Sequence, residues 1–189
     1  MAATSAELLG GRPLPRVLRE RPLIFLFGPP GCGKSAVAAR LCGEGTPCLD
    51  AAALSQAAAF AVRHRGWAVE LEQSERLIID GPTGLSGRPG VVRSVAELAQ
   101  RRAQLGRSTI FIEGPPGQTV LPLMEALPPL SRCTLVLRFP EGRGRRRFAL
   151  NACAERGLPP ELARRCAALQ PWTYRGVLAL LDELARGPA

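Results

Sequence analysis

The sequence predicts an α/β fold in which a five-stranded parallel sheet has helices on both faces and is followed by a small all-helical lid. From residue 22 to residue 140, short apolar runs alternate with stretches of helical periodicity, which is the pattern of a parallel sheet with crossover helices. After Pro140 only helical stretches remain. We therefore expect a flexible arm over 1–21, a core over 22–140 and a lid subdomain over 141–189.

The expected strands are short apolar runs, as strands that are buried on both faces require. They cover residues 23–27, 47–50, 76–80, 109–112 and 134–139. Alanine-rich and amphipathic stretches between them predict helices over 35–42, 51–65, 91–105 and 118–127. The lid helices are expected over 144–156, 160–169 and 173–185, with prolines near their starts, where proline is tolerated.

A phosphate-binding motif directly follows the first strand. Its residues match G-x-x-x-x-G-K-[ST] at every fixed position; they are Gly28, Pro29, Pro30, Gly31, Cys32, Gly33, Lys34 and Ser35. Glycines let successive backbone N–H groups point at one anion, and the helix that follows adds its positive N-terminus. The motif predicts a P-loop NTPase fold that binds ATP or GTP, with Lys34 on the β- and γ-phosphates and Ser35 on Mg²⁺.

The placement of lysine supports a working site. Lys34 is the only lysine in the chain, and the other 24 of the 25 basic residues are arginines. An ammonium is a compact charge that fits between phosphates, whereas a planar guanidinium does not take the same place. The only lysine of the chain therefore lies at the position where the motif requires one.

An acid ends the third expected strand. Asp80 follows the run Leu77-Ile78-Ile79, which is the Walker B pattern of an acid that holds Mg²⁺ directly or through water. We therefore expect Ser35 and Asp80 to be the metal-binding residues.

The bulk composition excludes several classes of protein. No apolar run approaches the roughly 20 residues needed to cross a bilayer. The six cysteines form no C-x-x-C pair and stand beside a single histidine, so we expect free thiols in the cytoplasm and no zinc site. The net charge of +9 favours an anionic partner such as a nucleotide, a nucleic acid or an acidic protein.

With these residues the chain resembles the AAA+ ATPases, most nearly their replication-initiator branch, over residues 22–187. The resemblance rests on the P-loop, the Asp80 strand, the 109–112 strand and the helical lid. It implies ATP and Mg²⁺ as cofactors, and it places Arg175, at the start of the last helix, at the position of the sensor 2 arginine. The chain ends just past the lid, so a DNA-binding domain is not expected, and the resemblance implies a nucleotide-dependent switch that acts on a protein partner or through self-association.

The chain also departs from the family pattern. Gly81 stands where a second acid usually follows the first, so hydrolysis is expected to be slow unless Glu113 or another acid substitutes. Glu113 ends the strand where the family has a polar sensor 1 residue, and it is our third catalytic candidate beside Lys34 and Asp80. Arg132 is a candidate for an arginine finger that acts on a neighbouring subunit.

Four arginines cluster at the entry to the lid: Arg143, Arg145, Arg146 and Arg147. They either contact the phosphates of a nucleic acid or an acidic partner, or form a solvated helix start.

Two other functions remain open. A small-molecule or nucleotide kinase fits the P-loop and Asp80-Gly81-Pro82, although Ala36 stands where kinases often have a second hydroxyl. A degenerate P-loop scaffold or nucleic-acid adaptor fits the missing second acid, although Lys34 and Ser35 are intact.

Overall fold

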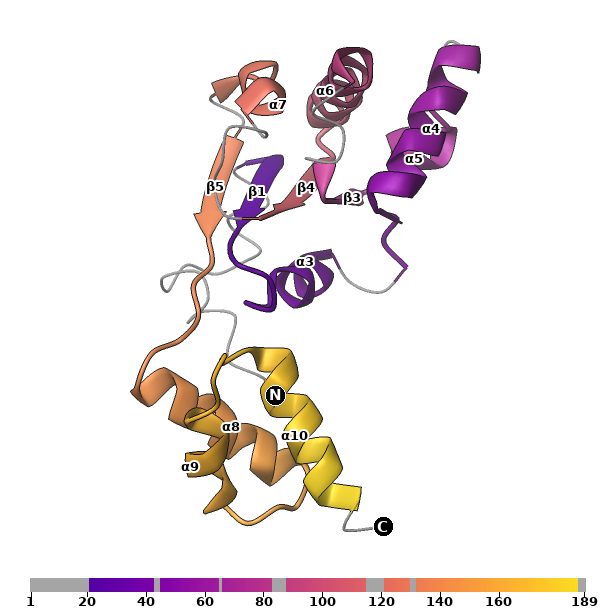
Figure 1. The fold of residues 1–189 in the computed structure, drawn as a ribbon. Helices are drawn as coiled ribbons and strands as arrows, with labels where there is room; N and C mark the ends of the chain where they lie inside the picture. Colours follow the sequence, from indigo (N-terminus) through magenta and orange to yellow (C-terminus); the bar gives the residue numbers. More distant parts are fainter. Residues whose placement is uncertain are drawn as a thin grey trace.

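The computed structural model describes residues 21–42, 45–64, 66–82, 88–114, 121–129 and 132–186, and it contains the predicted parallel sheet (Figure 1). The strands lie in the order β2-β3-β4-β1-β5, and every neighbouring pair is parallel. Their bounds are β1 Leu23–Phe27, β2 Cys48–Leu49, β3 Arg76–Asp80, β4 Ser108–Glu113 and β5 Arg132–Val136. Because all strands run the same way, their carboxyl ends meet at one edge of the sheet, and the phosphate-binding motif begins there, directly after β1.

Helices cover both faces of the sheet, as predicted. On one face, α3 (Lys34–Cys42) packs against the apolar side chains of Ile24 and Leu26. On the other face, α4 (Ala51–His64), α6 (Pro89–Gln104) and α7 (Leu121–Glu125) pack around Phe25 and Phe111. Side chains that contact one or the other group of helices alternate along β1, because successive side chains of a strand point to opposite faces.

Local signals in the sequence explain where two of these helices begin. The backbone N–H of Ala53 donates to Asp50 Oδ1 at 2.8 Å, so Asp50 caps the N-terminus of α4. In α6, Pro89 occupies the first turn, where the missing N–H costs nothing.

The lid contains α8 (Arg143–Glu155), α9 (Leu162–Ala167) and α10 (Tyr174–Arg186). Figure 1 shows these helices beyond the carboxyl edge of the sheet, on the side of α3. They enclose their own apolar core, in which Phe148 and Trp172 are buried. The ring of Phe139, in the segment that joins β5 to α8, lies edge-on to the Trp172 ring at a centroid distance of 6.1 Å, so the connecting segment packs on the lid core.

Some bounds differ from the predicted ones. The last strand is shifted, because β5 starts at Arg132 to pair with Leu23 and ends at Val136 opposite Phe27. Leu137 still donates from its backbone N–H to the Phe27 carbonyl at 2.7 Å, but the following residues turn toward the lid. A short helix, α5 (Val69–Gln73), was not predicted, because five residues are too few to show helical periodicity. The predicted arm over 1–21 lies outside the described residues except for Arg21.

A buried arginine joins the elements at the opposite edge of the sheet. Arg102, in α6, is 0% exposed, and it donates to Thr109 Oγ1 at 3.0 Å, to the Ser108 carbonyl at 2.8 Å and to Ser74 Oγ at 3.0 Å. It also donates to the carbonyl of Leu71. Burial lowers the pKa of Arg102 to about 10. The guanidinium therefore ties the end of α5 to the start of β4.

No helix within the described ranges is both long enough and apolar enough to span a lipid bilayer.

Candidate functional site

The loop between β1 and α3 has the shape of a phosphate cradle. Gly31 and Gly33 have φ of +78° and +91°, a region that side chains other than glycine rarely adopt. A Cβ at Gly28 would lie 2.6 Å from Cys32 Sγ and 2.6 Å from the Leu137 carbonyl oxygen, so the loop closes tightly against the segment after β5. The glycines of the motif are thus required by backbone conformation and by space.

Lys34 lies inside this loop. Its Nζ donates to the carbonyl oxygens of Gly28 at 2.7 Å and Pro29 at 2.9 Å. Ser35 follows in the first turn of α3 and is exposed, so its hydroxyl can reach a metal ion or a phosphate. The ammonium, the hydroxyl and the N-terminus of α3 therefore lie together at the carboxyl edge of the sheet.

The two candidate acids project from different faces of the sheet. Asp80 pairs with Ile112, and Glu113 pairs with Phe27. Register partners in parallel strands point to the same face. Ile112 belongs to the core on the side of α3, and Phe27 belongs to the core on the opposite side. Asp80 therefore shares the face of Ser35, whereas Glu113, which is 2% exposed, does not.

A cleft of about 790 Å³, which we call the phosphate cleft, separates this loop from α10. Lys34 and Ser35 line it from the core, and Tyr174 and Arg175 line it from the lid. Arg175, predicted to be a sensor 2 arginine, is exposed at the start of α10. The structure thus brings the predicted lid arginine and the predicted P-loop residues to one cleft.

The residues before Arg175 contact the loop directly. Thr173 Cβ and Cγ2 lie 3.1 Å from the position that a Cβ on Gly31 would take, and the Tyr174 ring lies 3.5 Å from the corresponding position on Gly33. Sequence reasoning missed both residues. The only signal was their adjacency to Arg175, since a contact across about 140 residues leaves no local pattern.

The donor set fits a magnesium–nucleotide complex. Lys34 would supply an ammonium for phosphates, and Ser35 and Asp80 would supply hard oxygen ligands on one side of the sheet. Among the described residues, no cluster of three or more histidine, cysteine or acidic side chains could hold a metal alone. Mg²⁺ is usually held by one or two carboxylates together with substrate phosphates, and Ser35 and Asp80 would fit such a shared site. All six cysteines are free thiols.

The arginines at the lid entry differ in their surroundings. Arg145 is held in place, because its Nε donates to the Pro140 carbonyl at 2.9 Å and its guanidinium lies 5.3 Å from the centre of the Trp172 ring. Arg143, Arg146 and Arg147 are exposed. Arg132, the arginine-finger candidate, starts β5 at the edge away from the P-loop and donates to the Met124 carbonyl.

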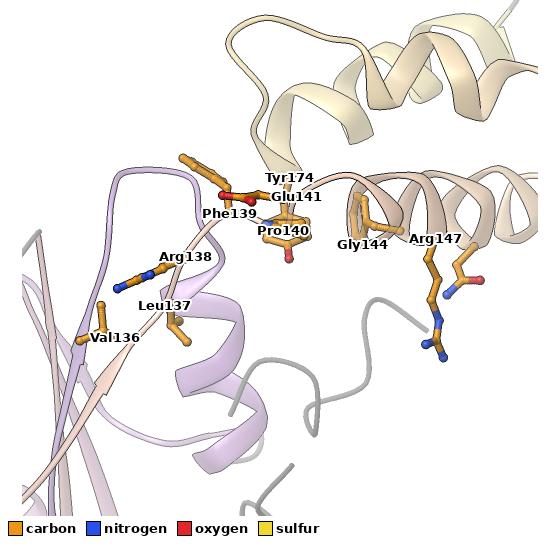
Figure 2. A pocket seen from close by; sticks show the side chains of 11 residues that line it. Val136, Leu137, Arg138, Phe139, Pro140, Glu141, Gly144, Arg147 and Tyr174 are labelled. Atoms are coloured by element: carbon orange, nitrogen blue, oxygen red, sulfur yellow. The ribbon is translucent and has the colours of Figure 1, made fainter. Parts of the chain in front are cut away.

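A second cavity, of about 460 Å³, lies between the segment that follows β5 and α8 (Figure 2). We call it the hinge cavity. Figure 2 shows Arg138 on the side of the sheet and Arg147 on the side of α8, and Tyr174 also lines the cavity.

Comparison with known proteins gives matches in structure. No family model matches the chain, and no curated protein sequence does. The AMPPCP-bound DnaA from Aquifex aeolicus superposes with a TM-score of 0.70 at 14% identity, over 99% of this chain and 63% of that chain. Domain III of the replication initiation protein DnaA from Thermotoga maritima gives 0.65 at 12% identity, over 93% and 82%.

A Walker-type ATPase of Pyrococcus abyssi gives a TM-score of 0.63 at 14% identity, over 91% of this chain and 65% of that chain. This chain therefore spans less than two thirds of the Aquifex and Pyrococcus proteins. At these identities the likeness is one of fold.

Proposed function

We propose that this chain, which has the fold of the AAA+ ATPases, binds ATP with Mg²⁺ in the cytoplasm and acts as a nucleotide-dependent switch. One observation carries the proposal: the P-loop of the core and Arg175 of the lid line the same cleft. A ligand that contacts both parts stabilises one arrangement of the lid over others, because its contacts differ between the arrangements.

The phosphate end of the proposed ligand is the better supported end. Lys34 and the backbone N–H groups of the loop would bind the phosphates, with Pro29, Pro30 and Cys32 completing the cradle. Ser35 and Asp80 would hold Mg²⁺, which bridges phosphate oxygens and neutralises their charge. ATP is favoured over GTP because the sequence has no N-K-x-D motif for reading guanine. The fold neighbour from Aquifex, whose structure contains AMPPCP, also supports an adenine nucleotide.

Slow hydrolysis belongs to the same proposal. Gly81 follows Asp80, so the strand that ends at the metal site carries one acid. Glu113 is the remaining candidate to orient a water molecule, but its side chain projects from the face opposite to Asp80 and Ser35. Since Gly81 and not a second acid follows Asp80, we propose that bound ATP persists and that the switch is set mainly by binding.

The switch would control binding of the chain to a protein partner or to a second copy of itself. The exposed arginines Arg143, Arg146 and Arg147 offer a cationic surface to such a partner or to nucleic acid, with Arg145 held against Trp172 beside them. We rank the protein partner first, because a lid that moves against the core changes the surface between the two.

The test is a single-turnover experiment with radiolabelled ATP and Mg²⁺ that resolves bound ATP, ADP, free phosphate and any phosphorylated acceptor. We expect bound ATP that stays intact or releases phosphate slowly, and no binding by the Lys34→Ala variant. Rapid transfer of label to an added nucleotide or metabolite would replace the switch with a kinase. No nucleotide binding by the wild-type chain would leave only a scaffold function.

A further inference from the structure

The core and the lid are joined by residues 137–142, which we call the hinge segment. Figure 2 shows Phe139 and Pro140 on this segment, and both line the hinge cavity that lies between the segment and α8. Because of this cavity, the hinge segment does not pack against α8 along its whole length. Particular contacts must therefore fix the angle at which the lid leaves the core.

Arg145 makes two such contacts at once. Its Nε donates to the Pro140 carbonyl at 2.9 Å, and the central carbon of its guanidinium lies 5.3 Å from the centre of the Trp172 ring, which is within the range of a cation–π interaction. Arg145 is half-buried, whereas Arg143 and Arg146 at the same helix start are exposed. The two contacts, which we call the hinge clamp, tie the hinge segment to the lid core.

Trp172 is held by its ring and not by its polar atom. Its side chain is 3% exposed, and no residue in the described part of the chain accepts a hydrogen bond from its Nε1. A buried indole N–H usually has a partner that fixes the ring. Here the ring lies edge-on to Phe139 and Phe148, at centroid distances of 6.1 and 5.9 Å. Its orientation therefore depends on aromatic packing and on Arg145.

The residues that follow Trp172 pack against the phosphate-binding loop. Thr173 Cβ lies 3.1 Å from the position that a Cβ on Gly31 would take. The Tyr174 ring lies 3.5 Å from the corresponding position on Gly33 and 5.0 Å, centre to centre, from the Trp172 ring. A shift of the Trp172 ring would therefore be passed to both residues, and through them to the residue at 175.

We propose that Arg145 is a positioning residue for the phosphate cleft: the hinge clamp holds Trp172, and thereby keeps Arg175 where its guanidinium reaches the terminal phosphate of ATP. Arg145 itself does not line that cleft. The role toward Arg175 rests on the proposed function, whereas the effect of Arg145 on the Trp172 ring does not.

The clamp requires an arginine. A guanidinium can donate from Nε to a carbonyl while its planar face lies over an aromatic ring, whereas a lysine has one compact ammonium for both contacts. Arg145→Lys keeps the charge and should therefore recover only part of the function that Arg145→Ala loses.

The first measurement is competition of ATP and ADP for a fluorescent nucleotide analogue. Arg145→Ala should reduce the preference for ATP over ADP by about tenfold, as loss of the Arg175 contact would, with little change in ADP affinity. Since Arg145 acts through Arg175, the double variant Arg145→Ala/Arg175→Ala should lose no more of this preference than Arg175→Ala alone. Arg164→Ala, at an exposed position of α9, is the control and should change nothing.

Two outcomes of the competition experiment would overturn the proposal. Losses that multiply in the double variant would show that Arg145 and Arg175 act independently. An unchanged preference for ATP in Arg145→Ala, or an equal loss in Arg164→Ala, would show that the hinge clamp does not position Arg175.

The second measurement needs no nucleotide. In a Trp67→Phe background, Trp172 is the only tryptophan, and its emission and its quenching by acrylamide are recorded. Arg145→Ala should shift the emission to the red and increase quenching, Arg145→Lys should do so less, and Arg164→Ala should match the Trp67→Phe reference. Unchanged emission and quenching in Arg145→Ala would overturn the clamp.

The two measurements separate the clamp from the proposed function. If the wild-type chain binds no nucleotide, the proposed function and the role toward Arg175 fail together, and the quenching data still decide whether Arg145 holds Trp172. Urea denaturation shows which variants fold. If Arg145→Ala does not, Arg145→Lys replaces it, and full ATP preference with unchanged quenching in that variant would overturn the need for both contacts.

Discussion

Lys34 donates a hydrogen bond of 2.7 Å from its Nζ to the carbonyl oxygen of Gly28, the residue at which β1 passes into the phosphate-binding loop. A second bond, of 2.9 Å, goes to the Pro29 carbonyl. The ammonium therefore fastens the loop, and under the proposed function it would exchange at least one of these carbonyls for a phosphate oxygen when a nucleotide binds.

We predict that Lys34→Ala abolishes ATP binding and leaves the chain folded. Loss of one charge-assisted contact to phosphate corresponds to roughly a hundredfold in affinity or more. Isothermal titration with ATP and far-UV circular dichroism are the measurements. Lys34→Arg is the matched control that keeps the charge, and it should bind poorly too, because the planar guanidinium does not fit the same place. Full affinity in Lys34→Arg would show that charge alone matters.

Gly31→Ala should destabilise the protein more than the same substitution at a glycine that has a similar φ but no neighbouring atoms close to its Cα. The left-handed conformation alone costs about 1–2 kcal/mol. Gly157 is the control for that cost, because its φ is +63° and a Cβ added there would have no atom within 4 Å. At Gly31 the new Cβ would also meet Thr173 at 3.1 Å. Urea denaturation of both variants measures the difference.

The extra loss of stability in Gly31→Ala, relative to Gly157→Ala, should be smaller in the double variant Gly31→Ala/Thr173→Ser. The serine removes Cγ2 and keeps Oγ1, which accepts a 2.9 Å hydrogen bond from the Gly176 N–H. Displacement of the lid should also be visible in the emission of Trp172 once the other tryptophan has been removed by Trp67→Phe. Equal losses of stability in Gly31→Ala and Gly157→Ala would mean that Thr173 and the lid move away from the new Cβ with no loss of stability.

Cys48 should report the charge at the proposed metal site. Burial and, after it, the charges of Asp80 and Asp50 raise the pKa of the Cys48 thiol. A raised pKa leaves less thiolate near pH 8, so alkylation is slow there. We predict that Asp80→Asn lowers the pKa and moves the pH profile of alkylation by iodoacetamide toward lower pH. Asp50→Asn should act in the same direction but more weakly, because Asp80 is the larger of the two charge effects.

Magnesium with ATP should shift the same alkylation profile in the wild-type chain, because a bound cation offsets the charge of Asp80. Mass spectrometry of the Cys48 peptide separates this signal from Cys42, whose pKa burial raises to about 11. A profile unmoved by magnesium and ATP would place the metal away from Asp80.

Arg175→Ala should reduce the preference for ATP over ADP by about tenfold while changing ADP affinity little. A guanidinium that reaches the γ-phosphate contributes about 1.5 kcal/mol or more through a charged hydrogen bond. Competition between the two nucleotides for a fluorescent analogue is the measurement. Arg186→Ala, an exposed arginine at the other end of α10, is the control. Equal effects of the two variants would exclude a specific role for Arg175.

Arg102→Met should destabilise the fold by about 3–5 kcal/mol, because it leaves the buried Thr109 hydroxyl and the Ser108 carbonyl without their donor. Thermal unfolding measures the loss. The neighbouring Arg101→Met removes an exposed arginine 3.5 Å from Glu72 and should cost well under 1 kcal/mol. Similar losses for both variants would show that the network around Arg102 contributes little.

The sequence predicted those parts of this fold that depend on local pattern. Buried parallel strands are continuous apolar runs, so β1 and β3 were placed with the bounds that the structure has. The P-loop was recognisable because its chemistry fixes residue types at fixed spacing. The fold class, the two covered faces and the helical lid followed from these elements.

What the sequence did not predict depends on contacts between distant residues. Strand order and register put Glu113 and Asp80 on opposite faces, although both end strands at the same edge. The buried role of Arg102 could not be distinguished from that of the exposed Arg101 beside it. Tyr174 is a half-buried tyrosine whose importance comes from Gly33, a residue far away in the chain.

The anchoring of Lys34 by two carbonyls also makes the loop selectively addressable by covalent chemistry. Apart from the α-amino group of Met1, Lys34 Nζ is the only primary amine in the chain. An amine-selective acylating reagent has one internal amine as its target, and that amine belongs to a half-buried side chain engaged with Gly28 and Pro29. The rate at which it is acylated therefore measures how often this loop releases its lysine, without any label introduced by mutation.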